Sequence, residues 1–590
     1  MEQAQSSTLA PRSHLHIEHT NVMSIKELLA SIAAYDDDSN DTNIITSSRS
    51  IIASRPLSPG QVIGPTRGIP SECVLDPVNL LKHHPLGQRV LAVSGSDDET
   101  RSRGGDEKLW LRDKMAFWIV LAAMAMEADT SNSEDHDEAP KKKRRLDEIS
   151  KKQRVADAYL NSLPREGPDP CSWHVTDRSR LLRGTPLFKQ VENALWIVRE
   201  EYHRVLDLLQ KDHICKMQEQ SLPPFDIDGR GLFPSVLWAR SMHISRSFPR
   251  SLIDEEGIWW VGEKSYVPPA SASASADQQH SEAEITKEVT NGSKILNVTI
   301  GGFSPPVIKL QSSHLEPESS PTPSSNANTR LPGSDLGIML PLYDLLDHKP
   351  GHAVQWESEI NAHNNSIRIR FRSVYSVAKG ETIHNNYGDV KSNAELLSTY
   401  GFAVEDNLMD KVEGIVLGLG VPTLNEKRSE DTETEFTNKK KLQEARMEII
   451  KEHNIPHRFE KDGAVLLLGP FSLGWKSPDA VDHTKEDNYS HNPSESEGII
   501  PQSLYQALGL IGMEDPEEGP VVSEDEIELL KEVLTGKLNN FEQTSVMPQE
   551  DTVYHQRQKF VDAYKSNQKR LLRAALNELD ELMPTEENDE

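Results

Sequence analysis

Apolar residues recur along the chain in two rhythms, one helical and one strand-like. They lie nearly all round Asp113–Glu127, which predicts a buried helix, and helical spacing also covers Phe233–Phe248. Ser366–Val377 alternates apolar residues with arginines, as a half-buried strand does. Further strands are expected at Ile51–Leu57, Lys294–Ile300, Ile383–Tyr387 and Val412–Leu419, and further helices at Asn393–Tyr400, Lys439–His453, after the Ser523/Glu526 capping box and at Val553–Leu582.

Four polar stretches interrupt these elements. They are rich in serine, proline, glycine or acidic residues and cannot bury enough apolar area to offset the entropy of ordering. We expect them to be mobile loops: Ser94–Lys108, Asp129–Lys152, Pro268–Ser334 and Asp479–Glu497.

Charge and composition exclude several classes of protein. The chain of 590 residues has 64 lysines and arginines against 93 acidic residues, a net charge of −29, which disfavours strong nucleic-acid binding and suits a basic protein partner. Its three cysteines are neither a disulfide framework nor a zinc site. The longest apolar run, Ala116–Met126, falls short of the about 20 residues that a bilayer span needs. We therefore expect an intracellular protein that is not membrane-bound.

The segment from Gly380 to Phe402 has the pattern most indicative of chemistry. It predicts a turn, a short strand ending at Tyr387-Gly388, and a helix capped by Asn393 that ends at Tyr400. An isolated buried tyrosine is usually an amphipathic core residue with a satisfied hydroxyl. Here, however, the order Tyr-Gly, Lys-Ser-Asn, Glu-Leu-Leu and Tyr-Gly-Phe resembles the signature of SET-domain methyltransferases of the RuBisCO large-subunit methyltransferase class.

Other blocks match the same family in the same order. They are Arg49-Ser50-Ile51-Ile52-Ala53 with Pro59-Gly60, Tyr159-Leu160 with Leu163-Pro164, Trp238-Ala239 with Ser245-Arg246-Ser247-Phe248, Pro341 to His348, and Tyr564 with Gln568 to Leu572. The resemblance covers roughly residues 40–582.

The resemblance implies an α+β fold, with a mostly β SET core that has a knot-like crossing. A helical insert interrupts this core, and a mostly helical C-terminal domain follows it. The expected segments are an N-terminal extension (1–40), the first part of the core (41–112), the helical insert (113–250, with a disordered loop at 129–152), a mobile insertion (251–335), the second part of the core (336–403), a helical substrate-binding domain (404–583) and an acidic tail (584–590).

The resemblance also implies transfer of a methyl group from S-adenosylmethionine to a protein side chain, most often lysine. The arginine of the Ser245–Phe248 block suits the cofactor's carboxylate, because a guanidinium forms charge-assisted hydrogen bonds with it. Tyr387 would orient the reacting groups and Tyr400 would line the lysine channel. The residues that the resemblance implies for cofactor binding are Arg49, Ser50, Ile51, Arg246, Asp344, Asp347, His348 and Tyr387, and no metal is implied.

Three departures from the family pattern leave alternatives open. Asp347 stands where the family has asparagine, and Ser48 and Ser50 stand where it has glycine. A catalytically inactive protein that acts as a binding module is therefore one alternative, and specificity for histidine is another. The partner expected is a basic segment of a non-histone protein, bound by a monomer.

The run Lys141–Arg145 is typical of a nuclear import signal, with a solvated charge run as the alternative. The expected location is cytoplasmic, nuclear or both.

Overall fold

The computed structural model describes most of the chain with gaps. The described residues are 27–32, 44–46, 51–65, 67–95, 106–131, 149–216, 232–253, 293–300, 333–349, 354–361, 367–388, 391–420, 433–459, 465–475, 499–517, 519–542 and 552–583. Residues Arg49, Ser50 and Lys141–Arg145, the expected loop Asp479–Glu497 and the expected tail 584–590 lie outside them.

The chain divides into two compact units. Unit 1 comprises Met1–Gly167, Trp196–Pro306 and Pro323–Asp389, and unit 2 comprises Pro168–Leu195, Val307–Thr322 and Val390–Glu590. The division differs from the expected domains at two places. Unit 2 begins before the helix at 393–400 rather than after it, and it includes 168–195, which we had assigned to the helical insert.

Contacts within unit 2 explain why 168–195 belongs there. Arg557 lies near the C-terminus, yet its guanidinium pairs with Asp177 at 2.7 Å and stacks 5.3 Å from the ring centre of Trp173. The indole of Trp173 donates to the carbonyl of Pro168 at 2.8 Å. Contacts between residues far apart in sequence, rather than chain continuity, therefore decide this boundary.

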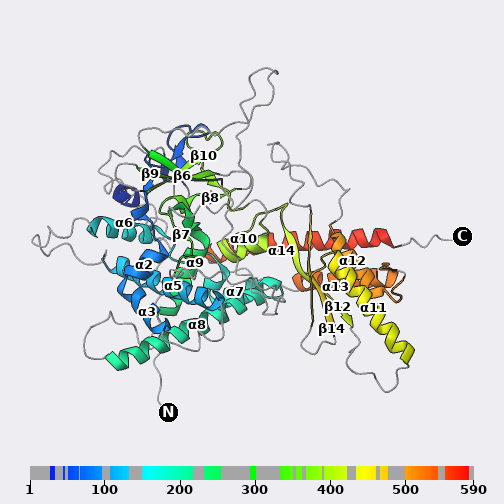
Figure 1. Cartoon of the computed structure of the whole chain (residues 1–590). Coiled ribbons are helices and arrows are strands. Elements are labelled where there is room, and N and C mark those ends of the chain that lie inside the picture. Colours follow the sequence, from blue (N-terminus) through cyan, green and yellow to red (C-terminus); the bar gives the residue numbers. More distant parts are fainter. Residues whose placement is uncertain are drawn as a thin grey trace, which may run out of the picture. The chain divides into compact units, whose positions relative to one another are not determined.

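Helix α5 (Asp106–Ser131) is the central helix of unit 1 (Figure 1). From Asp113 to Ala122 every residue is buried, as the all-round apolar pattern predicted. It packs against the neighbouring helices α2 (Pro77–His83), α3 (Pro85–Gly95), α6 (Ile149–Ser162) and α9 (Leu232–Arg246). Helix α8 (Pro186–Lys216) begins in unit 2 and continues into unit 1.

Two of the expected loops are shorter than the sequence suggested. Helix α5 already begins at Asp106 and continues to Ser131, and α6 begins at Ile149, so the ends of Ser94–Lys108 and Asp129–Lys152 are helical. Polar residues can extend a helix whose position is set by its apolar middle, which explains the difference.

The main sheet of unit 1 is antiparallel, with strand order β3-β10-β9-β6 and β4 also paired with β10. Ile369 and Phe371 of β10 are fully buried, and the arginines between them face the other side, where Arg370 lies opposite Glu357. The alternation predicted for this strand is therefore confirmed. The strands are β3 (Val62–Ile63), β4 (Ile69–Pro70), β6 (Ser293–Ile300), β9 (Val354–Asn361) and β10 (Ile367–Ser373).

Three two-stranded pairs complete the strands of unit 1. Strand β1 (Ile44–Thr46) pairs with β2 (Ile51–Ala53), and β5 (Ser247–Phe248) pairs with β7 (Ile338–Met339). The parallel pair of β8 (Asp347–His348) and β11 (His384–Asn385) joins two of the predicted motifs. The short 3₁₀ helices are η2 (Ser71–Cys73), η4 (Arg250–Leu252) and η5 (Tyr343–Leu345).

Unit 2 contains a three-stranded antiparallel sheet as well as helices, so a mostly helical domain was an incomplete description. The sheet order is β12-β14-β13, and only β12 had been expected because Pro470 and two glycines obscure the pattern of β14. The strands are β12 (Lys411–Gly420), β13 (His457–Phe459) and β14 (Val465–Gly474).

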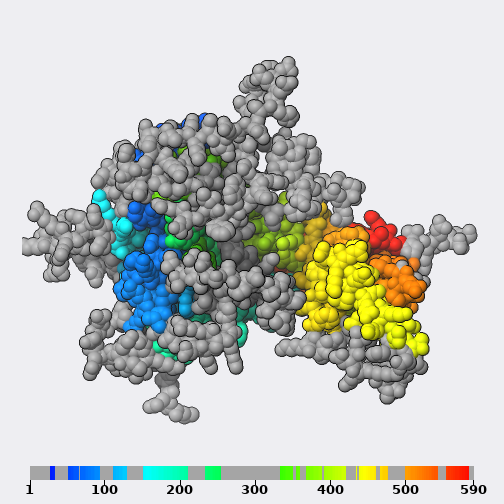
Figure 2. Space-filling model, in the orientation of Figure 1, coloured from blue at the N-terminus to red at the C-terminus, as the bar shows by residue number. Residues whose placement is uncertain are grey.

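The helices of unit 2 follow the predicted positions closely. Helix α13 begins with the expected capping box, in which the backbone and hydroxyl of Ser523 both bind Glu526. Helix α11 shows at the surface in yellow in Figure 2. These helices and the 3₁₀ helix are η3 (Pro170–Ser172), α7 (Val175–Leu181), α10 (Asn393–Tyr400), α11 (Glu433–Glu452), α12 (Gln502–Gly512), α13 (Glu524–Glu542) and α14 (Thr552–Leu582). No helix in the described part of the chain is long and apolar enough to cross a membrane.

Helix α10 is capped by Ser392, one residue before the expected Asn393. The Ser392 hydroxyl accepts the Glu395 N–H at 3.2 Å, and the Glu395 carboxylate accepts the Ser392 N–H at 2.9 Å. At the other end Gly401 has φ 78°, and a β-carbon there would lie 2.0 Å from the carbonyl oxygen of Pro168. Both ends of α10 are therefore determined by specific contacts.

We predict that Ser392→Ala destabilises α10 by about 1 kcal/mol, because the first turn loses its side-chain acceptor. Amide hydrogen exchange of residues 393–400 measures this loss. Ser398→Ala is the matched control, since its hydroxyl binds only the Glu395 carbonyl inside the helix. Equal exchange in both variants would contradict the capping role.

Candidate functional site

A buried cluster in unit 1 joins three residues from distant parts of the chain. The Asp344 carboxylate accepts a hydrogen bond from the Tyr159 hydroxyl at 2.6 Å and lies 3.3 Å from the guanidinium of Arg246. Arg246 also donates to the backbone carbonyl of Asp344 at 3.0 Å. These residues come from α6, the end of α9 and η5. Arg246 and Asp344, both predicted site residues, are therefore in direct contact.

The surroundings of Asp344 set the charge of the cluster. Its side chain has no exposed area. Burial raises the pKa of Asp344, and the Arg246 guanidinium and the Tyr159 hydroxyl oppose that rise. Burial and the adjacent Asp344 raise the pKa of Tyr159 well above its ordinary value, so this phenol stays protonated and acts as a donor.

The parallel pair β8–β11 places Tyr387 beside His348. The Tyr387 N–H donates to His348 Nδ1 at 3.0 Å, and the two ring centres are 5.1 Å apart. The Tyr387 hydroxyl donates to the carbonyl of Leu346 at 2.6 Å. Burial raises the pKa of Tyr387, and the nearby carboxylates of Asp347 and Asp344 add to the effect against Arg246. Tyr387 is therefore a neutral phenol rather than a base.

Two residues support the strand that leads to Tyr387. The Tyr375 hydroxyl donates to the carbonyl of His384 at 2.9 Å and accepts its N–H at 3.0 Å, as a neighbouring strand would. The carbonyl of Ile51 accepts the N–H of Ile383 at 2.9 Å, while the Ile51 side chain lies in the core. Ile51 thus supports the strand through its backbone.

Several buried polar atoms of this cluster have no hydrogen-bond partner in the described part of the chain. They are Arg246 Nε, Asp344 Oδ1 and the side-chain oxygen of Asn385. Buried polar groups are nearly always paired in folded proteins, with protein, water or a bound ligand. One unmet donor and one unmet carboxylate acceptor on adjacent side chains suit a ligand that has both a carboxylate and an ammonium group.

The remaining predicted residues have different surroundings. Asp347 is exposed, and its backbone pairs with His384 in the β8–β11 ladder. His348 contributes its ring nitrogen to Tyr387, as described above. Tyr400 lies in unit 2 at the end of α10, where its ring is 6.1 Å from Phe402 and 5.7 Å from the Lys391 ammonium. A shared channel of Tyr400 and Tyr387 stays a prediction, as does the knot-like crossing.

Sequence reasoning assigned no role to Tyr159 or Tyr375. Tyr159 was visible in the Tyr159-Leu160 block, but spacing alone does not indicate that its hydroxyl reaches a carboxylate 185 residues further along the chain. Tyr375 follows a predicted strand without any motif. Neither role had a signal in the local pattern.

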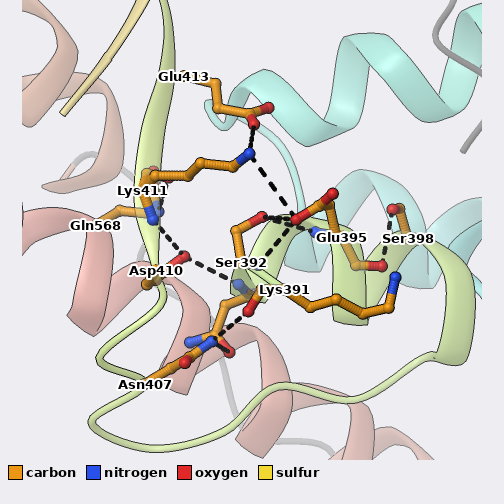
Figure 3. A network of polar contacts seen from close by, with 10 residues as sticks. Lys391, Ser392, Glu395, Ser398, Asn407, Asp410, Lys411, Glu413 and Gln568 are labelled. Atoms are coloured by element: carbon orange, nitrogen blue, oxygen red, sulfur yellow. Dashed lines mark hydrogen bonds and ion pairs between the residues drawn. The ribbon is translucent and has the colours of Figure 1, made fainter. Parts of the chain in front are cut away.

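A second polar network lies beneath α10 in unit 2 (Figure 3). Asp410 Oδ1 accepts the backbone N–H groups of Asn393 and Lys411 at 2.9 and 3.0 Å. The side chain of Asn407 donates to the carbonyl of Lys391 at 2.9 Å, and that of Gln568 donates to the carbonyl of Lys411 at 2.9 Å. The network fastens the N-terminus of α10 to β12 and α14, and therefore supports the helix that ends at Tyr400.

Comparisons with known proteins give a short but clear sequence similarity. No protein-family model matches the chain. Over 75 residues it is 43% identical to Ribosomal lysine N-methyltransferase set10 of Schizosaccharomyces pombe, a stretch that is 13% of each chain. Over 75 residues it is 36% identical to Ribosomal lysine N-methyltransferase 1 of Saccharomyces cerevisiae, covering 13% of this chain and 12% of the relative.

Over this stretch the chain is similar to ribosomal lysine N-methyltransferases. The resemblance to protein-lysine methyltransferases that the motifs predicted is thereby confirmed. The matched part is about an eighth of the length of either relative. The activity of the whole chain is therefore a matter for proposal.

Solved structures of Rubisco LSMT match over most of the chain at low similarity. The SET domain of LSMT bound to lysine and AdoHcy matches 95% of this chain and 91% of that chain, at 13% identity and a TM-score of 0.47. Rubisco LSMT bound to AdoMet matches 95% of this chain and 92% of that chain, at 12% identity and the same TM-score of 0.47. At this TM-score the likeness supports no argument about the site.

We predict that Tyr375→Phe speeds amide hydrogen exchange of residues 381–388 by about 10- to 100-fold. The substitution leaves the N–H and C=O of His384 without their partner, which costs about 1–3 kcal/mol. Tyr202→Phe, another buried tyrosine of unit 1 whose ring contacts are His203 and Phe233, is the control. Unchanged exchange in the Tyr375 variant would show that the hydroxyl does not support the strand.

We predict that Asp410→Asn removes a pH dependence of stability in unit 2. Burial raises the pKa of Asp410 to about 6, against several hydrogen bonds that lower it. Its folded-state pKa exceeds the unfolded value, so its favourable contribution is complete below about pH 4 and is lost as pH rises through 6.

Urea unfolding of the full chain at pH 4 to 7 measures this effect. The difference between wild type and Asp410→Asn should change by roughly 3 kcal/mol across that window, at about 1.4 kcal/mol for each pKa unit. Asp406→Asn, whose side chain is 81% exposed, is the control. A constant difference between wild type and Asp410→Asn would refute the prediction.

Proposed function

We propose that the chain is an S-adenosylmethionine-dependent protein-lysine N-methyltransferase. The observation that supports this most directly is the buried cluster of Arg246, Asp344 and Tyr387 with its unmet donor and acceptor. The similarity to ribosomal lysine N-methyltransferases points to the same chemistry.

The residues of the cluster fit the cofactor. S-adenosylmethionine would supply an electrophilic methyl group on a sulfonium, next to an amino-acid part with one carboxylate and one ammonium group. Arg246 Nε is a cationic donor without an acceptor, and Asp344 Oδ1 is an acceptor without a donor, among the described residues. Arg246 would hold the carboxylate and Asp344 the ammonium group, with charge-assisted hydrogen bonds in a buried setting.

Tyr387 would orient the lysine. Its hydroxyl proton is already donated to the carbonyl of Leu346, so its oxygen is available as an acceptor for the amine of the substrate. Because burial raises the pKa of Tyr387, we assign it orientation rather than proton removal. The substrate amine must arrive uncharged, and a buried channel favours this by lowering the pKa of lysine. Alignment would then supply most of the rate enhancement.

The proposal extends to the kind of substrate. The curated relatives are named ribosomal lysine N-methyltransferases, and this chain has a net charge of −29, which attracts basic segments. We propose a basic, non-histone protein substrate, methylated by a monomer in the cytoplasm, the nucleus or both.

The test is transfer of labelled methyl from S-adenosylmethionine to proteins of an undermethylated cell extract. We predict a discrete labelled band that falls roughly a hundredfold with Tyr387→Phe, since one oriented hydroxyl is removed from the reacting groups. Tyr202→Phe should leave the band unchanged.

Two results would contradict the proposal. One is the absence of S-adenosylmethionine binding in calorimetry. The other is a label on a residue other than lysine, which fragmentation of the labelled protein in a mass spectrometer would reveal.

A further inference from the structure

We propose that Tyr159 is a positioning residue that holds the Asp344 carboxylate in the orientation in which Oδ1 receives the ammonium group of the cofactor. This inference rests on the proposed function, because it concerns the same binding site. It assigns a role in cofactor binding to α6, a helix far from the signature segment in sequence.

The first step is the unequal use of the two carboxylate oxygens. Oδ2 of Asp344 accepts from the Tyr159 hydroxyl at 2.6 Å and lies 3.3 Å from Arg246 Nη1. Oδ1 is buried and has no partner among the described residues. A carboxylate can exchange its oxygens by rotating about its terminal bond, and two donors on one oxygen oppose this rotation.

The second step is the chemistry of the unmet atom. A buried carboxylate oxygen without a donor costs free energy, which a bound N–H donor would recover. Arg246 Nε is a buried donor without an acceptor in the same cluster. An α-amino acid group has both complements, so the two unmet atoms fit the amino-acid part of the cofactor rather than its nucleoside part.

The third step is that Tyr159 remains a donor at all physiological pH values. It is fully buried, and burial with the neighbouring Asp344 raises its pKa far above neutrality. The other ionisable groups that face Asp344 are Arg246 and Tyr387. The Tyr159 hydrogen bond lowers the pKa of Asp344, so it also helps to keep this carboxylate ionised for a cationic ligand.

The test compares two ligands by calorimetry on the full chain. S-adenosylhomocysteine has the amino-acid part, and 5′-methylthioadenosine has the nucleoside and sulfur without it. We predict that Tyr159→Phe weakens S-adenosylhomocysteine binding about 5- to 20-fold at pH 8 and changes methylthioadenosine binding less than twofold. Tyr202→Phe should change neither affinity.

A pH series separates positioning from simple loss of structure. Without the Tyr159 hydrogen bond the pKa of Asp344 rises further, so the decline of S-adenosylhomocysteine affinity on acidification should begin at a higher pH than in wild type. In an Asp344→Asn background, Tyr159→Phe should add less than a twofold effect, because the oriented carboxylate is gone.

Three results would overturn the inference. They are an unchanged ratio of the two affinities in Tyr159→Phe, an equal loss for both ligands at every pH, and full additivity with Asp344→Asn. Should Tyr159→Phe fail to fold, Asp344→Asn alone takes its place, and an unchanged ratio then overturns the inference. Wild type that binds neither ligand would overturn the proposed cofactor as well, which distinguishes the two failures.

Discussion

The ion pair between Arg246 and Asp344 is the contact on which the candidate site depends. Removing a carboxylate and a guanidinium from water costs several kcal/mol per ion, and the pair recovers this cost only with good geometry and further hydrogen bonds. Here Tyr159 and the Asp344 backbone carbonyl supply those hydrogen bonds. Loss of any one partner would leave a buried charge uncompensated. The pair therefore constrains three elements at once.

The constraint reaches Tyr387 through short strands rather than a large sheet. Strand β8 follows η5 directly, and its parallel pairing with β11 sets the register of the segment that ends at Tyr387. A two-residue ladder has little stability by itself. The bonds from Tyr375 to His384 and from Ile51 to Ile383 supply what the ladder lacks. A precise side-chain position is thus obtained from several weak backbone contacts.

Unit 2 positions α10 by a different means. Asp410 accepts two backbone N–H groups while buried, which favours a carboxyl group that titrates near neutrality. Helix α10 therefore depends on residues of β12 and α14 that follow it in the chain, and it belongs to unit 2 although its sequence motif continues from Tyr387. A continuous motif and a compact unit need not share a boundary.

Local spacing by itself determined the elements. The all-round apolar pattern of α5, the alternation of β10 and the capping box of α13 each depend on neighbours within a few residues, and each prediction was confirmed. The motif at Gly380–Phe402 also predicted the resemblance to methyltransferases. Irregular elements were harder, because glycine and proline in β14 weaken the alternation on which a strand prediction relies.

Only the tertiary structure decided which side chains meet. Arg246 and Asp344 are 98 residues apart, and Tyr159 and Asp344 are 185 apart. Spacing specifies which face of an element is apolar, but not which distant element covers it. The bond from Tyr159, the cap at Ser392 instead of Asn393, and the place of 168–195 in unit 2 all depend on packing between segments far apart in sequence. The sequence determined the candidate residues, and long-range packing decided their partners and charge states.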